Sequence, residues 1–285
     1  LYVNTFQNRR PAMKLHFLGT GASEGIPNPY CKCELCEQVR KTGGRDVRTR
    51  SSAIIDDEIQ IDISPEFFHQ ANVNHIDVTK IKDLLITHTH PDHFNVGELH
   101  NRVRNFAFNV EHPMYIYGSD KAINGCLNGI VDLTPDRFNL SILIPFVTIT
   151  TSSGAKITPL IANHEKWEMC YIYFIEKNGK TLLYGHDSGY YGDLTWNWLE
   201  NKKIDLIVLE CTYGYRQNDK TNNHMSIETV INMKQKFKEN NNLSQQTQIL
   251  TSHHSHSCGF DYQSLVEIFK PHQIEVAYDG LIKNI

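Results

Sequence analysis

The sequence predicts an α/β protein in which two mixed β-sheets pack face to face and helices cover their outer faces, an αββα sandwich. Short runs of β-branched and apolar residues recur along the chain, and helical patterns fall between some of them in both halves. Strands this frequent, with helices interspersed, are typical of layered sheets. No linker rich in Pro, Gly or Ser interrupts the pattern, so we expect residues 13–285 to form a single domain.

The individual elements follow from the spacing of apolar residues. Strands are expected at residues 15–18, 53–55, 59–63, 84–87, 114–117, 147–150, 157–161, 171–175, 181–184, 206–209, 249–251 and 274–277. Helices are expected at residues 95–106, 227–238 and 262–269. Residues 238–248 are polar and of low complexity, which predicts an exposed loop.

The amino-acid composition favours a metal-binding protein with a small net charge. The chain has 285 residues, 15 of them His, and a net charge of −4. A net negative charge provides no overall attraction for nucleic acid. We interpret the basic segment 40–50 as a solvated loop. No run of 18 apolar residues and no signal-peptide pattern occurs, so we expect a cytoplasmic protein without a membrane partner. Residues 1–12 lack periodicity and precede Met13, and we expect a non-native or disordered extension there.

A dense group of metal-ligand types follows the apolar strand near residue 85. The segment reads His88-Thr89-His90-Pro91-Asp92-His93. In an extended chain His88 and His90 point the same way, because side chains alternate. Pro91 ends the strand, after which we expect Asp92 to cap a helix with His93 in its first turn. Two imidazoles on one side of this turn, and a carboxylate with an imidazole on the other, suit two adjacent divalent metals.

This motif resembles the HxHxDH signature of the metallo-β-lactamase superfamily, which implies the αββα fold of that superfamily. The resemblance implies further ligands at later strand ends, and His164, Asp187 and His253 occupy such positions. By resemblance, one metal is held by His88, His90 and His164. The other is held by Asp92, His93 and His253, and Asp187 bridges the two.

Three other residues near these strand ends have supporting or competing roles. Asp62 matches an early strand-end Asp of the superfamily that orients the site from behind its ligands. His186 would face the other side of its strand from Asp187, so we interpret it as structural. His254 competes with its neighbour His253 as the ligand.

A second constellation offers three thiols at metal-ligand spacing, Cys31, Cys33 and Cys36. Disulfides between such close neighbours would be strained. A tetrahedral structural zinc needs a fourth ligand, and the His-rich stretch 252–258 offers candidates. Sequence spacing alone leaves that choice open. The chain's other four cysteines occur singly, and we interpret most of them as buried small apolar residues.

The beginning of the chain narrows the resemblance to the PhnP-type phosphodiesterases, which act on a cyclic ribose phosphate. The matching residues are Gly19-Thr20-Gly21, Gly25-Ile26-Pro27, the cysteine motif and the late Tyr278-Asp279-Gly280. The family's late His-x-x-His motif supplies one ligand to each metal site. It therefore selects His253 for the catalytic metals and His256 for the cysteine site, with Cys258 as the competing fourth ligand.

Resemblance also suggests groups that act on the substrate. Glu210 and His224 match a proton-transfer pair of RNase Z, and a His at the position of His224 lies near the scissile phosphate in PhnP-type enzymes. Lys166, just after His164, is a candidate contact for a phosphate oxygen. A solvated Lys and a helix-capping His are the structural alternatives.

These features predict a metal-dependent hydrolase, with Asp92, Glu210 and His224 in its chemistry. We expect two divalent metals at the active site, zinc or manganese with iron also allowed, and one structural zinc. The favoured substrate is a small or cyclic ribose- or nucleotide-type phosphodiester. The alternatives are an RNase Z-like endonuclease that processes tRNA 3′ ends, a thioester or lactone hydrolase, and a metal-binding protein without activity. The resemblance also allows a homodimer.

Overall fold

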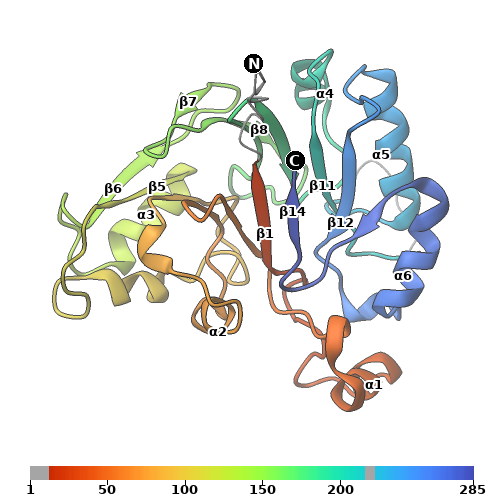
Figure 1. Cartoon of the computed structure of the whole chain (residues 1–285), viewed down its shortest axis with the longest axis horizontal. Coiled ribbons are helices and arrows are strands. Elements are labelled where there is room, and N and C mark those ends of the chain that lie inside the picture. The colour runs from red at the N-terminus through yellow and green to blue at the C-terminus, as the bar shows by residue number, and fades with distance from the viewer. Residues whose placement is uncertain (1–12, 216–221) are drawn as a thin grey trace, which may run out of the picture.

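Two seven-stranded sheets and the helices outside them make up the computed structural model, which describes residues 13–215 and 222–285 (Figure 1). The first sheet has the order β14 (Ile282–Asn284), β1 (Lys14–Gly19), β2 (Ser52–Ile55), β3 (Ile59–Ile61), β4 (Asp83–Leu85), β5 (Met114–Gly118) and β6 (Phe138–Ile142). The second has the order β13 (Glu275–Val276), β12 (Gln248–Ser252), β11 (Leu206–Glu210), β10 (Lys180–Gly185), β9 (Tyr171–Lys177), β8 (Lys156–Ile161) and β7 (Ile149–Thr150). Both sheets are mixed, as predicted.

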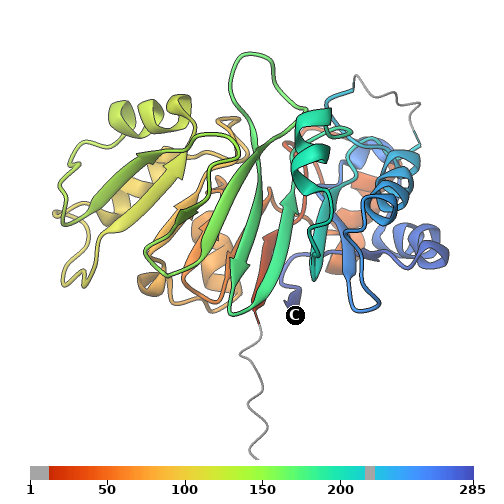
Figure 2. The same cartoon turned by 90° about the horizontal axis from the view of Figure 1, so that it is seen from above.

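Helices cover the two outer faces. They are α1 (Glu34–Thr42), α2 (Phe67–Val73), α3 (Asp120–Gly129), α4 (Asp193–Leu199), α5 (Ile227–Glu239) and α6 (Tyr262–Phe269). In Figure 1, α2 and α3 lie on one side of the strands and α4, α5 and α6 on the other, while α1 stands at the lower edge. Figure 2 shows the same arrangement from above. None of the helices in the described part of the chain is long and apolar enough to cross a membrane.

Strand β9 shows why the sheets stack. Its side chains are apolar on both faces, which is typical of a strand buried between two layers. Tyr171, Tyr173 and Ile175 pack into the core between the sheets, whereas Ile172 and Phe174 pack into the outer core with the helices. Because side chains alternate between the two faces of a strand, the apolar residues of β9 are shared between two hydrophobic cores.

The observed elements correct several expectations. Residues 95–106 do not form an α-helix, because only a 3₁₀ stretch over Val96–Arg102 is present. Asp92 therefore caps no helix. The chain makes a turn at residues 91–93, and Phe94 then pairs with Ile63 beside the first sheet. The cysteine segment, expected to be a loop over residues 31–36, runs into α1 at Glu34. The expectation for residues 1–12 lies outside the described residues.

Buried Asp83 joins the two sheets at the end remote from the ligands. Its carboxylate accepts hydrogen bonds from the backbone N–H groups of Ser152 and Ser153, at 3.0 and 2.9 Å, and from the Ser153 hydroxyl at 2.5 Å. These donors belong to the turn between β7 and β8, so one carboxylate of the first sheet fixes a turn of the second.

We expect the substitution Asp83→Asn to lower the free energy of unfolding by about 1.5–3 kcal/mol, because the buried donors lose a charged acceptor. Urea denaturation followed by circular dichroism measures this change. The control is Asp136→Asn, since Asp136 is more than half exposed and pairs with the equally exposed Arg104. Equal losses in the two variants would contradict a special role for Asp83.

Candidate metal centre

Strand direction brings the predicted ligands to one edge of the sandwich. Strands β3 and β4 are parallel, as are β10, β11 and β12. β8 runs in the same direction as β10, because each pairs antiparallel with β9. The predicted residues that follow these strands are Asp62 after β3, His88 after β4, His164 after β8, Asp187 after β10 and His253 after β12. Side chains far apart in sequence therefore meet at the carboxyl ends of the strands.

The first ligand cluster contains His88, His90 and His164. One ring nitrogen of each lies within 4.8 Å of those of the other two. The rings of His88 and His90 are 4.5 Å apart, and the rings of His88 and His164 are 4.7 Å apart. Nε2 of His164 lies 3.1 Å from Nδ1 of His90. Lone-pair nitrogens that converge in this way suit a transition metal.

The second cluster contains Asp92, His93, Asp187 and His253, all buried. The Asp187 carboxylate lies 3.1 Å from Nε2 of His93 and 3.0 Å from Nε2 of His253. It also lies 3.9 Å from Nε2 of both His88 and His164. Asp187 therefore stands between the two clusters, where the resemblance requires a bridging ligand.

The charges of this cluster balance only with cations present. Burial would raise the pKa of Asp187, but His253 and His93 outweigh it and hold the pKa of this carboxyl well below its ordinary value. Conversely, burial lowers the pKa of His253, yet Asp187 and its hydrogen bond raise it to about 10. Without metal, protonated imidazoles therefore supply the positive charge that the buried carboxylates need.

The hydrogen bonding of His88 indicates whether these residues fit a metal. Its Nδ1 lies 3.0 Å from the Thr87 hydroxyl, whereas its buried Nε2 has no hydrogen-bond partner among the described residues. Nε2 faces Asp187 at 3.9 Å, which is too long for a hydrogen bond. A buried polar atom normally has a partner, and a metal held by His88, His90 and His164 would provide it. The site therefore fits the ions that the resemblance implies.

Asp62 lies behind the ligands, on the side of His93. It accepts hydrogen bonds from the Thr87 backbone N–H and hydroxyl, both at 2.8 Å, and lies 2.6 Å from Nδ1 of His93. This contact directs Nε2 of His93 toward the carboxylates. Asp62 and His253 have left-handed backbones, with φ of 57° and 55°, which are uncommon for residues other than glycine and often occur at functional sites. Thr87, which directly precedes the histidine motif, was not among the predicted site residues.

Glu210 and His224 form the predicted pair. Nδ1 of His224 donates to the buried Glu210 carboxylate at 2.8 Å. Burial lowers the pKa of His224, but the charge of Glu210 and this hydrogen bond outweigh it, so the pKa is raised. The His224 ring lies 4.9 Å from that of His164 and 5.9 Å from that of His253. An imidazole that is readily protonated therefore lies beside both clusters.

Thr212 connects this pair to the second cluster, and sequence analysis did not single it out. Its hydroxyl lies 2.5 Å from the Glu210 carboxylate and 2.9 Å from Nδ1 of His253. Since a carboxylate only accepts, the hydroxyl donates to Glu210 and accepts from His253. In the neutral ring, which is the form that a metal binds, Nε2 of His253 then keeps its lone pair for the side that faces Asp187.

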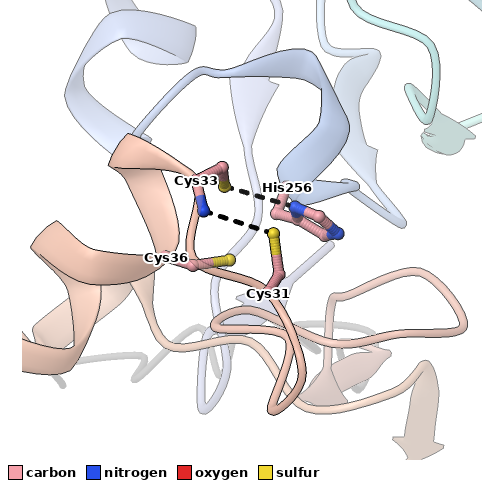
Figure 3. A group of neighbouring side chains, drawn as sticks. All are labelled: Cys31, Cys33, Cys36 and His256. Carbon is pink, nitrogen blue, oxygen red and sulfur yellow. Dashed lines mark hydrogen bonds between the residues drawn. The ribbon is translucent and has the colours of Figure 1, made fainter.

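The cysteine motif meets His256 at the start of α1, and the four side chains point toward a common centre (Figure 3). Sγ of Cys33 lies 3.5 Å from Nδ1 of His256. The backbone N–H of Cys36, followed by His256, lowers the pKa of the Cys33 thiol to about 6 against the effect of burial. Burial, with the Cys33 thiol beside it, raises the pKa of Cys36 to about 11. Three thiols and an imidazole at this spacing match the ligand set of a structural zinc.

The remaining candidates lie outside these groups. Cys258 donates from its thiol to the Thr212 carbonyl at 3.0 Å and is not in the cysteine cluster. His186 and His254 are buried and belong to none of the ligand groups formed by the described residues. Lys166 is exposed after His164, so its contact with substrate stays a prediction.

Sequence comparison agrees with this geometry. A profile of the beta-lactamase superfamily domain matches residues 58–243, which include Asp62 and the motif at residues 88–93. The chain belongs to the beta-lactamase superfamily. The resemblance inferred from the histidine motif is therefore confirmed. The cysteine motif and His253 lie outside the matched residues of this superfamily member.

Solved structures share the fold along nearly the whole chain. A diphosphatase from the PhnP family is 20% identical, with a TM-score of 0.73, and the match covers 96% of this chain and 98% of that chain. Zinc-bound PqqB from Methylobacterium extorquens is 15% identical, with a TM-score of 0.74, and the match covers 95% of this chain and 100% of that chain. Identities this low establish the shared metallo-β-lactamase fold alone.

One curated relative matches part of the chain. An octanoyltransferase from Porphyromonas gingivalis (strain ATCC BAA-308 / W83) is 36% identical over 107 residues. These residues make up 36% of this chain and 20% of that protein, so the chain spans about a fifth of that relative's length.

We expect Co²⁺ added to metal-free protein to give thiolate-to-cobalt absorption in the near ultraviolet, because three thiols converge with His256. His256→Ala should weaken cobalt binding and change its visible bands, whereas Cys258→Ser should leave the spectrum unchanged. The reverse result, in which Cys258→Ser loses thiolate absorption, would assign the fourth position to Cys258.

Proposed function

We propose that this superfamily member is a metal-dependent phosphodiesterase that acts on a small or cyclic, ribose- or nucleotide-type phosphodiester. One observation carries the proposal: the Glu210–His224 pair lies directly beside two ligand clusters that share Asp187. Two-metal sites of this type are used for in-line displacement at phosphorus. The fold shared with a PhnP-family diphosphatase supports chemistry at a phosphate group.

The proposed ligands divide between two metals. His88, His90 and His164 would hold one, Asp92, His93 and His253 the other, and Asp187 both. When bound, such metals supply Lewis acidity toward water and positive charge for the phosphoryl oxygens. Nitrogen and oxygen donors of this kind accept zinc, manganese or iron. The cysteine cluster with His256 would hold a separate structural zinc.

The chain itself supplies the proton for the leaving group. The Glu210 carboxylate holds Nδ1 of His224 and favours the protonated ring, so Nε2 can give a proton to the departing sugar oxygen. Glu210 also orients His253 through Thr212. The same carboxylate would therefore support both proton transfer and a metal ligand.

We expect purified protein with added Zn²⁺ or Mn²⁺ to hydrolyse bis(p-nitrophenyl) phosphate, and EDTA to abolish the reaction. His224→Ala should reduce kcat by about 10² or more, because it removes the general acid. The release of p-nitrophenolate measures both. His272→Ala is the control, since His272 is a histidine beyond α6 that lies in no ligand group. Protein that carries its metals yet shows no turnover would refute phosphodiester chemistry.

The match to part of an octanoyltransferase favours a second candidate, hydrolysis of an acyl ester or thioester. Octanoyl-coenzyme A and a precursor tRNA, assayed beside the phosphodiester, compare the three substrate classes directly. A kcat/KM for the octanoyl thioester above that for every phosphodiester would replace our proposal with the acyl hydrolase. Preference for the tRNA would favour the endonuclease.

We expect Glu210→Gln to shift the alkaline limb of the kcat profile to lower pH. Without the carboxylate, the largest remaining influence on His224 is burial, which lowers its pKa, so the protonated ring is lost at lower pH. A pH–rate series measures the shift, with the exposed Glu200→Gln as the control. If the alkaline limb of the pH–rate profile were unchanged in Glu210→Gln, the proton would come from another group.

A further inference from the structure

A short loop joins the two metal-ligand groups. His253 follows β12 and belongs to the second catalytic cluster, whereas His256, three positions later, begins the 3₁₀ turn η4 (His256–Cys258) and belongs to the cysteine cluster. We propose that metal held by Cys31, Cys33, Cys36 and His256 positions His253, and so raises the affinity of the catalytic cluster for its own metals. This inference rests on the proposed function.

The loop is tied to the segment that leads into the cysteines. The His254 backbone N–H donates to the Thr20 carbonyl, and the Ala22 N–H donates to the His254 carbonyl, both at 3.0 Å. The Glu24 carboxylate accepts from the Ser255 hydroxyl and lies 3.6 Å from Nε2 of His256. Any movement of His256 relative to the cysteine segment therefore acts on the backbone beside His253.

A second connection runs through Cys258 and Thr212. The Cys258 thiol donates to the Thr212 carbonyl at 3.0 Å, and the Thr212 hydroxyl lies 2.9 Å from Nδ1 of His253. A Cβ on Gly214 would lie 2.7 Å from Cβ of Cys258, so the two segments are in close contact. A shift of η4 would therefore move Thr212, whose hydroxyl orients His253 and also contacts Glu210.

Beyond these hydrogen bonds and the 3.3 Å contact of Asn28 with Nε2 of His256, the described residues give the cysteine segment only a small apolar contact area. Helix α1 packs through a small cluster of its own, Ile26, Leu35 and Val39, separate from the three large cores. In Figure 1 it stands at the edge of the molecule. Three apolar side chains make only a small core, whereas a structural zinc site contributes folding energy outright. Metal at this site would therefore add a strong connection between α1 and the loop of His253 to the hydrogen bonds that already join them.

Coupling of this kind is reciprocal, so metal at each site favours metal at the other. Loss of metal from the cysteine cluster would leave the His253 side chain near the other ligands but would hold it less firmly in position. Groups that orient a ligand typically change metal affinity by about 10- to 100-fold when they are removed. We expect a weakening of this size at the histidine cluster.

The test compares full-length wild type with Cys31→Ser, which removes one thiol outside the helix. Zinc content is measured by mass spectrometry after dialysis at buffered free zinc, and the affinity of the remaining sites by competition with a chromophoric chelator. Cys126→Ala, a buried cysteine in α3, is the matched control. Circular dichroism verifies the fold. Should Cys31→Ser unfold, Glu24→Ala takes its place, because it removes the tie to Ser255 and keeps all four ligands.

The expected result is that Cys31→Ser loses the cysteine-bound zinc and also binds zinc at the histidine cluster about 10- to 100-fold more weakly than wild type and Cys126→Ala. Loss of the cysteine-bound zinc alone, with the affinity of the histidine cluster unchanged, would overturn the inference and leave the proposed function intact. Wild type that holds no metal at the histidine cluster would overturn both.

Discussion

Burial of two carboxylates beside each other is the constraint on which this site depends. Asp92 and Asp187 both approach Nε2 of His93, at 3.3 and 3.1 Å, and both carboxylates are almost fully buried. Uncompensated charges in such a place cost several kcal/mol each, so the fold must supply positive charge or bind it. Protonated His93 and His253 can do so without metal, and divalent ions can do so with more charge. The surrounding architecture gathers these groups and keeps them in place.

Polar groups around the ligands fix the direction of each ring. Asp62 holds His93, and Thr212 holds His253, so both imidazoles turn Nε2 toward Asp187. The strand ends are themselves tied across the sandwich, since Tyr173 donates from its hydroxyl to the Ile86 carbonyl at 2.5 Å. The cysteine cluster extends this support through His256 to the loop of His253. Rigid supports of this kind let a metal site keep its geometry while substrate binds and leaves.

Expectation and structure differ where the local pattern is weak and where the tertiary structure overrides a local pattern. The short strand β14 escapes prediction because three residues carry no readable period, and it forms only by pairing with β1 at the other end of the chain. Residues 95–106 have apolar residues at helical spacing, but the only helical structure among them is a 3₁₀ helix over Val96–Arg102. Thr87 and Thr212 were not foreseen, because a threonine becomes a support only when a distant ligand reaches it.

The sequence by itself determined the alternation that builds two sheets and the dense motif at residues 88–93, because both are local patterns with a physical period or composition. It also determined which residue types could act, since His, Asp and Cys at strand ends are ligands wherever they meet. Only the tertiary structure decided which of them meet. Parallel strands bring Asp62, His164, Asp187 and His253 to one edge, and a single loop connects His253 to the cysteine cluster. Distances of this kind depend on packing between segments remote in sequence, which no local pattern encodes.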